Sequence, residues 1–375
     1  MTCPSPNGST MVLINQTDPA TSLTSVNILT ITLHGIVSTI GIVENLLILG
    51  IVGFRVRRSI ISIWILNLAA SDFLATCFLP FFTLYMARGN TWMLGPTFCR
   101  IYSSSFFLNM FVSAFLLAAI SLDRCLVVVR PVWAQNYRTV ELVGKICGAI
   151  WFAAVIFTIP FYLFRDTIQL STKKVLCYYN YARLLPSEPY DLKALCKQRK
   201  EGLVIMKFLF AFLIPLLIII FSYVAVNRSL AYRGCRRSFR FVRLVVAVVV
   251  TFILCWAPYH IFIIMEMMAP NNSSARKFAT SALPISATVG FLNSVINPIL
   301  YVFSCPDLCR KIRHSLGAVM ESVLAEDLAE LARRRSTRTS VSNSELGMRK
   351  KSSTTVFTPL KAETTEQVEF LTNSS

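Results

Sequence analysis

Polar side chains that could bind an ion occur inside long apolar stretches of this sequence. A charged or amide side chain in hydrocarbon costs free energy, so such residues are candidates for function. One interpretation is that they hydrogen-bond to one another and hold helices together. The other is that a subset binds a sodium ion that stabilises a resting state, namely Asp72, Ser113, Asn293 and Asn297. The complete polar set is Asn45, Asp72, Ser113, Asn293, Ser294 and Asn297.

Two proline-containing strings in later apolar stretches could change conformation. A proline inside a helix removes a backbone hydrogen bond and bends the helix. Trp256 lies two residues before Pro258, and Asn297 and Tyr301 flank Pro298. We expect both strings to act as two-state elements that a bound ligand biases.

An adjacent acid and base, Asp123 and Arg124, stand at the end of the third apolar stretch. We expect the Asp123 carboxylate to hold the Arg124 guanidinium until the surrounding helices open. This pair is therefore a third candidate switch.

These residues require elements that place them in hydrocarbon. Hydrophobic residues make up 54% of the chain and charged residues 15%, whereas soluble domains carry about 25% charged residues. A bilayer core of roughly 30 Å needs a helix of about 20 apolar residues. The sequence therefore predicts an all-α fold, a seven-transmembrane helix bundle over residues 28–304. The seven spans are expected at 28–54, 61–87, 97–129, 143–164, 202–230, 241–268 and 279–304.

Basic residues cluster after alternate spans, and short loops rich in Lys and Arg stay in the cytosol. This pattern predicts a multi-pass plasma-membrane protein with an extracellular N-terminus and a cytosolic C-terminus. The formal net charge of +18 is then explained by cytosolic edges that face anionic membrane lipid. Nucleic acid is not an expected partner, because the chain offers no soluble basic domain. The clusters are Arg55, Arg57 and Arg58, then Arg130 and Arg138, then the 228–243 segment, then Arg310, Lys311 and Arg313.

Three segments flank the predicted bundle. Residues 1–27 are expected to be extracellular and contain glycosylation motifs at Asn7 and Asn15. Residues 305–325 carry apolar residues at helical spacing with basic residues between them, which predicts an amphipathic helix on the membrane surface. Cys305 and Cys309 in that segment are candidates for palmitoylation. Residues 326–375 predict a disordered cytosolic tail, with candidate phosphorylation sites at Ser336, Thr337, Thr339 and Ser340.

The order of these motifs resembles the rhodopsin-like G-protein-coupled receptors over residues 28–320. Two positions depart from the family pattern. Cys125 follows Arg124 where most members have tyrosine, and Ser238 offers no acid to Arg124 from the sixth span. The resemblance is carried by residues 41–45 (GIVEN), 67–72 (NLAASD), 123–125 (DRC), Trp151, Pro215, 255–258 (CWAP) and 297–301 (NPILY).

Longer strings narrow the resemblance to the chemoattractant branch of this family. The resemblance implies a receptor for a carboxylate-bearing lipid mediator, such as an eicosanoid, with no enzymatic activity and no cofactor apart from the candidate sodium ion. A peptide chemoattractant receptor of the same branch is the alternative. The strings cover residues 106–111, 121–138, 164–168, 177–180 and 321–324.

Two basic residues are suited to bind the carboxylate of such a lipid. Lys207 lies near the outer part of the fifth span, where the alternative is that its side chain reaches the lipid headgroups. Arg165 follows the fourth span, where the alternative is a surface ion pair with Asp166. The basic 165–201 loop adds a field that draws anions toward the bundle.

Aromatic residues would complete this ligand site. Tyr179 and Tyr259 are expected to donate hydroxyl hydrogen bonds to the carboxylate. Tyr102 occupies a position where the resemblance leads us to expect histidine. The apolar part of the lipid would lie against Phe81, Phe82, Phe106 and Phe107.

Four cysteines fall in predicted extracellular positions, where disulfides persist. The resemblance supports a disulfide between Cys99 and Cys177 that fixes the 165–201 loop over the mouth of the bundle. Cys3 and Cys196 remain as a second pair, which we expect to tie the N-terminal segment across the same mouth.

The resemblance also implies intracellular partners. We expect an inhibitory-type heterotrimeric G protein to enter a cleft beside Arg124 and mediate chemotaxis, and arrestin to bind the tail after phosphorylation. A transporter or channel is disfavoured because no inverted repeat is visible. A membrane enzyme is disfavoured because no nucleophile motif occurs and the three histidines are scattered. These histidines are His34, His260 and His314.

Overall fold

A computed structural model describes residues 25–171, 174–184, 191–233, 239–270 and 273–304. They belong to one compact unit that spans Met1–Ser315. Most of segment 1–27 and all of 305–375 lie outside the described residues. The amphipathic helix, the tail and their modification sites therefore stay predictions, as do the glycosylation sites.

Seven helices in the described residues are long and apolar enough to cross a membrane, which confirms the predicted bundle. Hydrocarbon offers no water to backbone groups, so a spanning segment must satisfy its hydrogen bonds internally as a helix. The fifth span combines two α-helices with a π-helical turn, η1, and a short helix, α4, follows the third span. The helices are α1 (Ser25–Phe54), α2 (Ile60–Ala87), α3 (Gly95–Val129), α4 (Pro131–Tyr137), α5 (Val140–Leu163), α6 (Leu192–Lys207), η1 (Phe208–Leu213), α7 (Ile214–Tyr232), α8 (Phe239–Met268) and α9 (Ser274–Ser304).

The fifth span begins earlier than predicted. The candidate span covers Ala194–Tyr232 rather than 202–230, and its first helix, α6, starts at Leu192. The Asp191 side chain accepts a hydrogen bond from the Ala194 N–H at 3.0 Å and caps this helix. Its first turns carry charged residues, which an apolar count excludes although they are helical.

The π-helical turn η1 separates α6 from α7. Pro215 lies in the first turn of α7 and has no N–H to donate to the helix. Lys207 is the last residue before the wide turn. Because π-helical turns occur frequently at functional sites, the position of this turn favours a functional role for the neighbouring Lys207.

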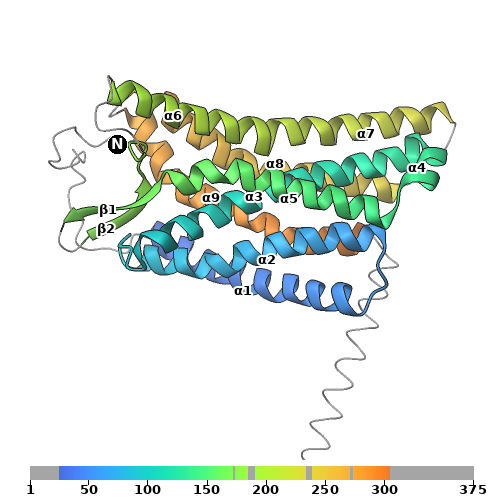
Figure 1. The fold of residues 1–375 in the computed structure, drawn as a ribbon, viewed down its shortest axis with the longest axis horizontal. Coiled ribbons are helices and arrows are strands. Elements are labelled where there is room, and N and C mark those ends of the chain that lie inside the picture. Colours follow the sequence, from blue (N-terminus) through green and yellow to red (C-terminus); the bar gives the residue numbers. More distant parts are fainter. Residues whose placement is uncertain (1–24, 172–173, 185–190, 234–238, 271–272, 305–375) are drawn as a thin grey trace, which may run out of the picture. The chain divides into compact units, whose positions relative to one another are not determined.

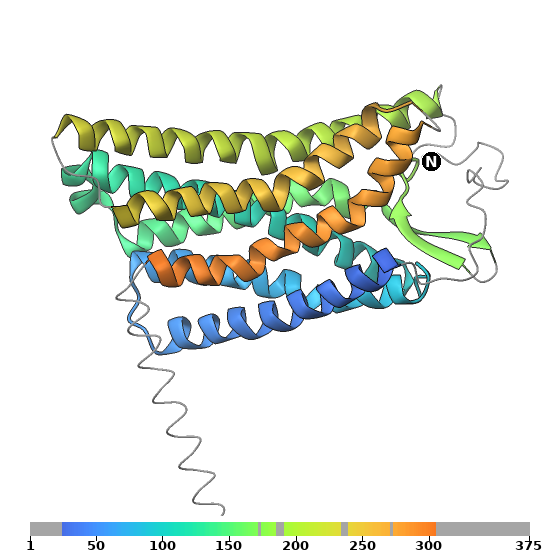
Figure 2. The same ribbon diagram turned by 180° about the vertical axis from the view of Figure 1, so that it is seen from behind.

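Helix α3 runs through the middle of the bundle and packs against α2, α5, α7 and η1 (Figure 1). Met110, Phe111 and Leu116 of this helix are fully buried. By contrast, Phe152 of α5 and Phe221 of α7 are 69% and 67% exposed, as expected for side chains that face lipid. Helices α8 and α9 lie side by side, as the view from behind shows (Figure 2).

A two-stranded antiparallel sheet, which the all-α prediction missed, follows α5. Strands β1 (Arg165–Ser171) and β2 (Lys174–Tyr179) pair with Arg165 opposite Tyr179 and Thr167 opposite Cys177. The sheet lies at the end of the bundle where α6 begins, and α4 lies at the opposite end (Figure 1). These ends are called the hairpin end and the α4 end below.

Candidate functional site

Lys207 is a buried cation near the hairpin end. Its side chain is 2% exposed, and its Nζ donates a hydrogen bond to the Tyr259 hydroxyl at 3.3 Å. The ammonium also lies 5.2 Å from the ring centre of Phe107 and 5.3 Å from that of Phe161, within range of cation–π attraction. No described carboxylate forms an ion pair with it. The buried position contradicts the alternative in which Lys207 reaches the headgroups.

Arg165 presents a second cation from the first residue of β1. Its Nε donates to the Ser103 hydroxyl at 2.7 Å, and its guanidinium lies 4.5 Å from the Tyr179 ring centre. The alternative pairing with Asp166 is not formed, because Asp166 accepts from Arg100 at 3.2 Å. No described residue hydrogen-bonds to the two terminal amino groups of Arg165, so they can bind an anion.

The backbone of Arg165 is held by two other arginines. Its carbonyl oxygen accepts from Arg100 Nε at 3.1 Å and from Arg183 Nη1 at 3.4 Å. Arg183 also donates to the Leu163 carbonyl at 2.9 Å. Sequence reasoning did not identify these positioning residues, because their partners are backbone atoms.

The two predicted tyrosines lie beside these cations. Tyr259 accepts the hydrogen bond from Lys207, and the buried Tyr179 hydroxyl has no partner among the described residues. Tyr179 stacks on Tyr181 with ring centres 5.3 Å apart. Burial raises the pKa of the Tyr179 phenol above its ordinary value, so the group stays protonated and can donate to an anion.

By ring contacts, the predicted aromatic residues fall into two groups, because Trp92 stacks on both Tyr102 and Phe98 and so joins the Phe82–Tyr102 pair to Phe81. Phe106 lies 5.5 Å from the Tyr259 ring and 6.1 Å from the Trp256 ring, measured between centroids, and Phe107 lies beside Lys207. Phe82 and Tyr102 stack with centroids 6.0 Å apart. Phe81 packs against Phe98 at 4.8 Å and Phe78 at 6.3 Å. Phe106 and Phe107 are therefore the members that contact the Lys207 group directly.

An ion-pair network that was not predicted joins three helices at the hairpin end. The Glu266 Oε1 atom of α8 accepts from Lys200 of α6 at 2.6 Å and from Arg276 of α9 at 3.4 Å. Glu266 is the single acid in the sixth predicted span. The rule that a charge inside a span is a functional candidate would have identified it.

The Asp72 carboxylate is the common hydrogen-bond acceptor of a buried polar cluster in the bundle. It accepts hydrogen bonds from Ser294 at 2.8 Å, Asn297 at 2.8 Å, Asn109 at 2.9 Å and Ser113 at 3.4 Å. The predicted hydrogen bonding between helices is thus present. Asn109, which the sequence analysis did not single out, is one of the donors.

Several buried atoms near this cluster remain without a hydrogen-bond partner among the described residues. Asn45 reaches α9 by donating to the Ser294 carbonyl at 3.0 Å, yet its Oδ1 accepts nothing. The Oδ1 atoms of Asn293 and Asn297 are likewise unpartnered. Unpaired buried polar atoms cost free energy, so these oxygens suit a bound cation or water.

The predicted switch residues lie on α3, α8 and α9. The carboxylate of Asp123 is bound by Arg138, through Nε at 2.5 Å and Nη2 at 2.7 Å. Arg138 follows α4 and was used only for orientation in the sequence analysis. Asp123 therefore binds an arginine fifteen positions along the chain, whereas the prediction paired it with its neighbour Arg124.

Trp256 couples α8 to α9. Its ring is 1% exposed, and a Cβ at Gly290 would lie 3.2 Å from its Cζ3 atom. Pro258 lies inside α8 and Pro298 inside α9. The side chain of Tyr301 and residue Ser238 lie outside the described part of the chain.

The disulfide between Cys99 and Cys177 is confirmed, with an S–S distance of 1.98 Å. It fastens β2 to the start of α3. Cys196 is also a disulfide-bonded cysteine and is 3% exposed. Its predicted partner, Cys3, lies outside the described residues, so that pairing stays a prediction.

Comparisons with known proteins agree with this arrangement. A family model described as "7 transmembrane receptor (rhodopsin family)" matches residues 44–301. Prostaglandin D2 receptor 2 of Mus musculus is 52% identical over 306 residues, which cover 82% of this chain and 80% of the relative. This similarity confirms the narrower resemblance carried by the long strings, which is to prostaglandin D2 receptor 2.

Two further relatives are receptors of the chemoattractant branch and have lower identity. Chemerin-like receptor 1 of Rattus norvegicus is 32% identical and covers 79% of this chain and 80% of the relative. The C3a anaphylatoxin chemotactic receptor of Oncorhynchus mykiss is 32% identical and covers 81% of each chain.

Proposed function

Since the chain belongs to the rhodopsin family of G-protein-coupled receptors, we propose that its ligand is a carboxylate-bearing lipid mediator, prostaglandin D2 or a related eicosanoid. Members of this family are multi-pass plasma-membrane receptors that bind a ligand and a heterotrimeric G protein, and they are not enzymes. The observation that carries the proposal is the buried ammonium of Lys207, which no described carboxylate neutralises.

A carboxylate placed between Lys207 and Arg165 would remove this imbalance. It would accept hydrogen bonds from the ammonium, from the free guanidinium ends, and from the unpartnered Tyr179 hydroxyl. Charge-assisted hydrogen bonds of this kind are the strong ones. The apolar chain of the lipid would extend along Phe106 toward Trp256, which links ligand binding to the α8–α9 contact at Gly290.

A peptide chemoattractant is the second candidate. The names of the relatives at 32% identity favour it, since one is a chemotactic receptor for C3a. The C-terminal carboxylate of a peptide could bind the same two cations. A peptide would also contact the hairpin, whereas a lipid would bind deeper among the aromatic rings.

The proposed orientation places the hairpin end outside the cell. Two arguments support it, namely the basic clusters after alternate spans and the Cys99–Cys177 disulfide at the hairpin end, since disulfides persist in oxidising compartments. The G protein would then bind at the α4 end, beside Arg124. An inhibitory-type G protein, a chemotactic response and arrestin binding to the phosphorylated tail complete the proposal.

A sodium ion at Asp72 is part of the proposed resting state. Asp72, Ser113, Asn293 and Asn297 would hold it, and the unpartnered Oδ1 atoms of Asn293 and Asn297 suit the oxygen ligands that such a hard cation prefers. The ion would supply a positive charge to the buried carboxylate. Its binding would compete with the donors that now surround Asp72.

The test is a screen of prostanoids, other eicosanoids and chemotactic peptides for inhibition of cyclic-AMP accumulation in cells that express the chain. Lys207→Ala and Arg165→Ala should each abolish the response to the active lipid while surface expression persists. Lys197→Ala is the matched control, because Lys197 lies on the same helix with a side chain that is 75% exposed. Retained potency in both variants, or a response only to peptides, would reject the lipid proposal.

A further inference from the structure

Arg233 joins the end of α7 to the end of α3, at the α4 end of the bundle. Its Nη1 atom donates a hydrogen bond to the Val128 carbonyl at 3.1 Å, and its Nη2 atom donates to the Val129 carbonyl at 3.3 Å. Arg233 is the C-cap of α7, and its own N–H donates to the Ser229 carbonyl at 3.2 Å. The pair of bonds, called the Arg233 tether below, therefore fastens one helix end to another.

The two carbonyls that Arg233 binds belong to the last turn of α3, which ends at Val129. The last four carbonyls of an α-helix have no N–H donor within the helix. A cation near them also interacts favourably with the negative end of the helix dipole. The planar guanidinium offers two donors side by side, so it suits two consecutive carbonyls better than an ammonium would.

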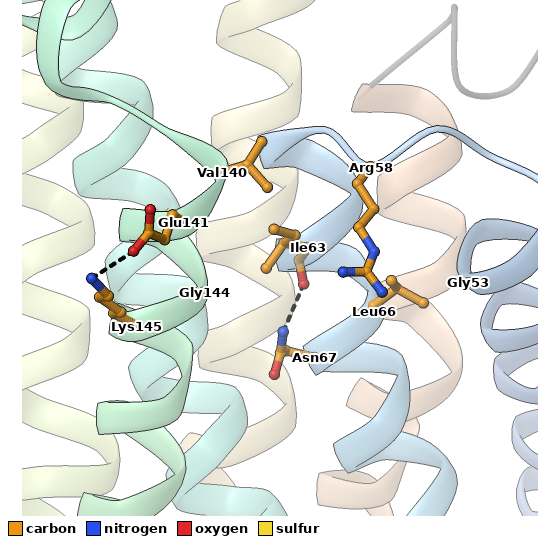
Figure 3. A pocket seen from close by; sticks show the side chains of 9 residues that line it. All are labelled: Gly53, Arg58, Ile63, Leu66, Asn67, Val140, Glu141, Gly144 and Lys145. Atoms are coloured by element: carbon orange, nitrogen blue, oxygen red, sulfur yellow. Dashed lines mark hydrogen bonds and ion pairs between the residues drawn. The ribbon is translucent and has the colours of Figure 1, made fainter.

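The tether differs from the other exposed ion contacts at this end of the bundle. Lys145 of α5 binds Glu141, one turn earlier in the same helix, at 2.7 Å (Figure 3). That contact is made within one helix and restrains no neighbour. Arg233 forms no ion pair with a described residue and instead bonds to a residue 105 positions away in the chain. Its contact can therefore oppose the separation of α7 from α3.

The same part of α3 is held on another side by Arg138, whose guanidinium binds the Asp123 carboxylate. Arg124 lies between Asp123 and Val129 in the chain, so it stands between the two attachments. A partner that enters beside Arg124 needs space there, and a neighbouring helix must move away from α3 to provide it. Position 238 carries serine, so an ion pair between that position and Arg124 cannot supply the restraint.

We propose that Arg233 is a positioning residue for G-protein coupling. Its two bonds hold the end of α7 against α3 in the resting receptor, and they break when the cleft beside Arg124 opens. The proposal rests on the proposed position of the G protein at the α4 end, and it does not depend on the ligand bound near Lys207. Because the acceptors are backbone atoms, the tether depends on the guanidinium and not on the side chains of Val128 and Val129.

The first test measures nucleotide exchange on an inhibitory-type G protein by the full-length, ligand-free receptor in nanodiscs. Arg233→Gln should raise this basal exchange about two- to fivefold, the effect of one cation at an exposed helix C-terminus. Arg233→Lys should give a value between those of the wild type and Arg233→Gln, because an ammonium lacks the planar pair of donors. A rise is informative, since misfolding would lower the exchange.

Two control variants remove a positive charge from the same end of the bundle and leave the tether in place. Arg228→Gln changes an exposed residue of α7, five positions before Arg233. Lys145→Gln removes a cation whose partner lies in its own helix. Both should leave basal exchange unchanged. An equal rise in either control would assign the effect to net charge and overturn the proposal.

A second measurement detects the tether without a G protein. Hydrogen–deuterium exchange of the ligand-free receptor should be severalfold faster at residues 126–130 and 229–233 of Arg233→Gln than in the wild type, because untied helix ends open more often. Arg228→Gln should match the wild type. Faster uptake with unchanged basal exchange would assign Arg233 to local stability alone and overturn the coupling role.

Two further outcomes would also overturn the proposal. Unchanged values in both measurements would mean that the tether restrains nothing. A fall in basal exchange at normal surface expression would mean that the guanidinium contacts the G protein directly. If the wild type drives no exchange on the inhibitory-type G protein, with or without ligand, the coupling proposal fails instead, and the variants are compared on the G-protein class that responds. Should Arg233→Gln fail to reach the membrane, Arg233→Lys decides.

Discussion

Two buried charges in the bundle, Lys207 and Asp123, have different surroundings. Near the hairpin end, the Lys207 ammonium has a neutral hydroxyl and aromatic rings for neighbours. At the α4 end, the Asp123 carboxylate is joined to Arg138 by two short hydrogen bonds. A charge with its counter-charge holds elements together, whereas a charge without one favours the arrival of an opposite charge. The Lys207 group is therefore suited to receive a ligand, whereas the Asp123–Arg138 pair holds α4 against α3, as the Glu266 ion pairs hold α6, α8 and α9 together at the hairpin end.

The sharpest test of this comparison is Lys207→Met, which keeps most of the side-chain length and removes the charge. Hydrogen bonds to charged groups contribute about 1.5–3 kcal/mol, so potency of the active lipid should fall by up to about a hundredfold. Stability of the ligand-free receptor should rise, since a buried charge without a partner is costly. Cyclic-AMP dose–response curves and thermal unfolding of the purified receptor measure the two effects. A loss of stability would break the comparison.

The opposite sign is expected for Asp123→Ala. Removing the carboxylate leaves the Arg138 guanidinium partly buried and unpaired, which should lower the free energy of unfolding by about 1–3 kcal/mol. Arg138→Ala should have a similar effect. The double variant should be much less destabilised than the sum of the two, as a double-mutant cycle would show. Additive losses would mean that the two side chains do not act as a pair.

A smaller loss of lipid potency is expected for a variant that disturbs the position of Arg165 and leaves its charge in place. Arg183→Ala deletes the bonds to the Leu163 and Arg165 carbonyls and should reduce lipid potency about fivefold, the equivalent of one net hydrogen bond. Arg183→Lys should restore part of the potency, and Arg88→Ala, which removes an exposed charge, should not change it. A loss of surface expression without a change in potency would assign Arg183 to folding alone.

The smallest effect is expected for a substitution in the middle of the bundle, at the contact between Trp256 and Gly290. Gly290→Ala would place a methyl group 3.2 Å from the Trp256 ring and should shift ligand-independent signalling by a few fold, or about 1 kcal/mol. Gly35→Ala is the control, because a Cβ there meets nothing within 4 Å. Basal cyclic-AMP levels at matched surface expression measure the shift. Equal behaviour of the two variants would mean that the Trp256–Gly290 contact does not transmit the state of the ligand site.

The seven helices were predictable because hydrocarbon forces each span to be long, apolar and helical. The Cys99–Cys177 disulfide followed from the family resemblance. The hairpin was not predictable, since its strands have only seven and six residues and depend on pairing between residues far apart in the chain, such as Arg165 and Tyr179. The early start of α6 escaped an apolar count because its first turns are charged.

The charged residues of the candidate site were predictable from the sequence. The residues that contact or surround them were less so. Lys207 is hydrogen-bonded to Tyr259 and Arg165 lies over the Tyr179 ring, because buried polar side chains need partners. The partner of Asp123 depends on how α4 folds back, which no local spacing encodes. Phe81 joined a different aromatic cluster, since helical spacing does not fix which neighbour a ring will meet.

The π-helical turn between Lys207 and Ile214 determines how the first part of the fifth span is rotated about the helix axis relative to α7. A π turn accommodates one more residue than an α turn, and one residue corresponds to about 100° of rotation and 1.5 Å of rise. If the turn tightened to α geometry, the segment that bears Lys207 would rotate by about that angle relative to α7. The Lys207 ammonium would then move away from Tyr259. The π-helical geometry of Phe208–Leu213 therefore determines whether this cation faces the interior of the bundle.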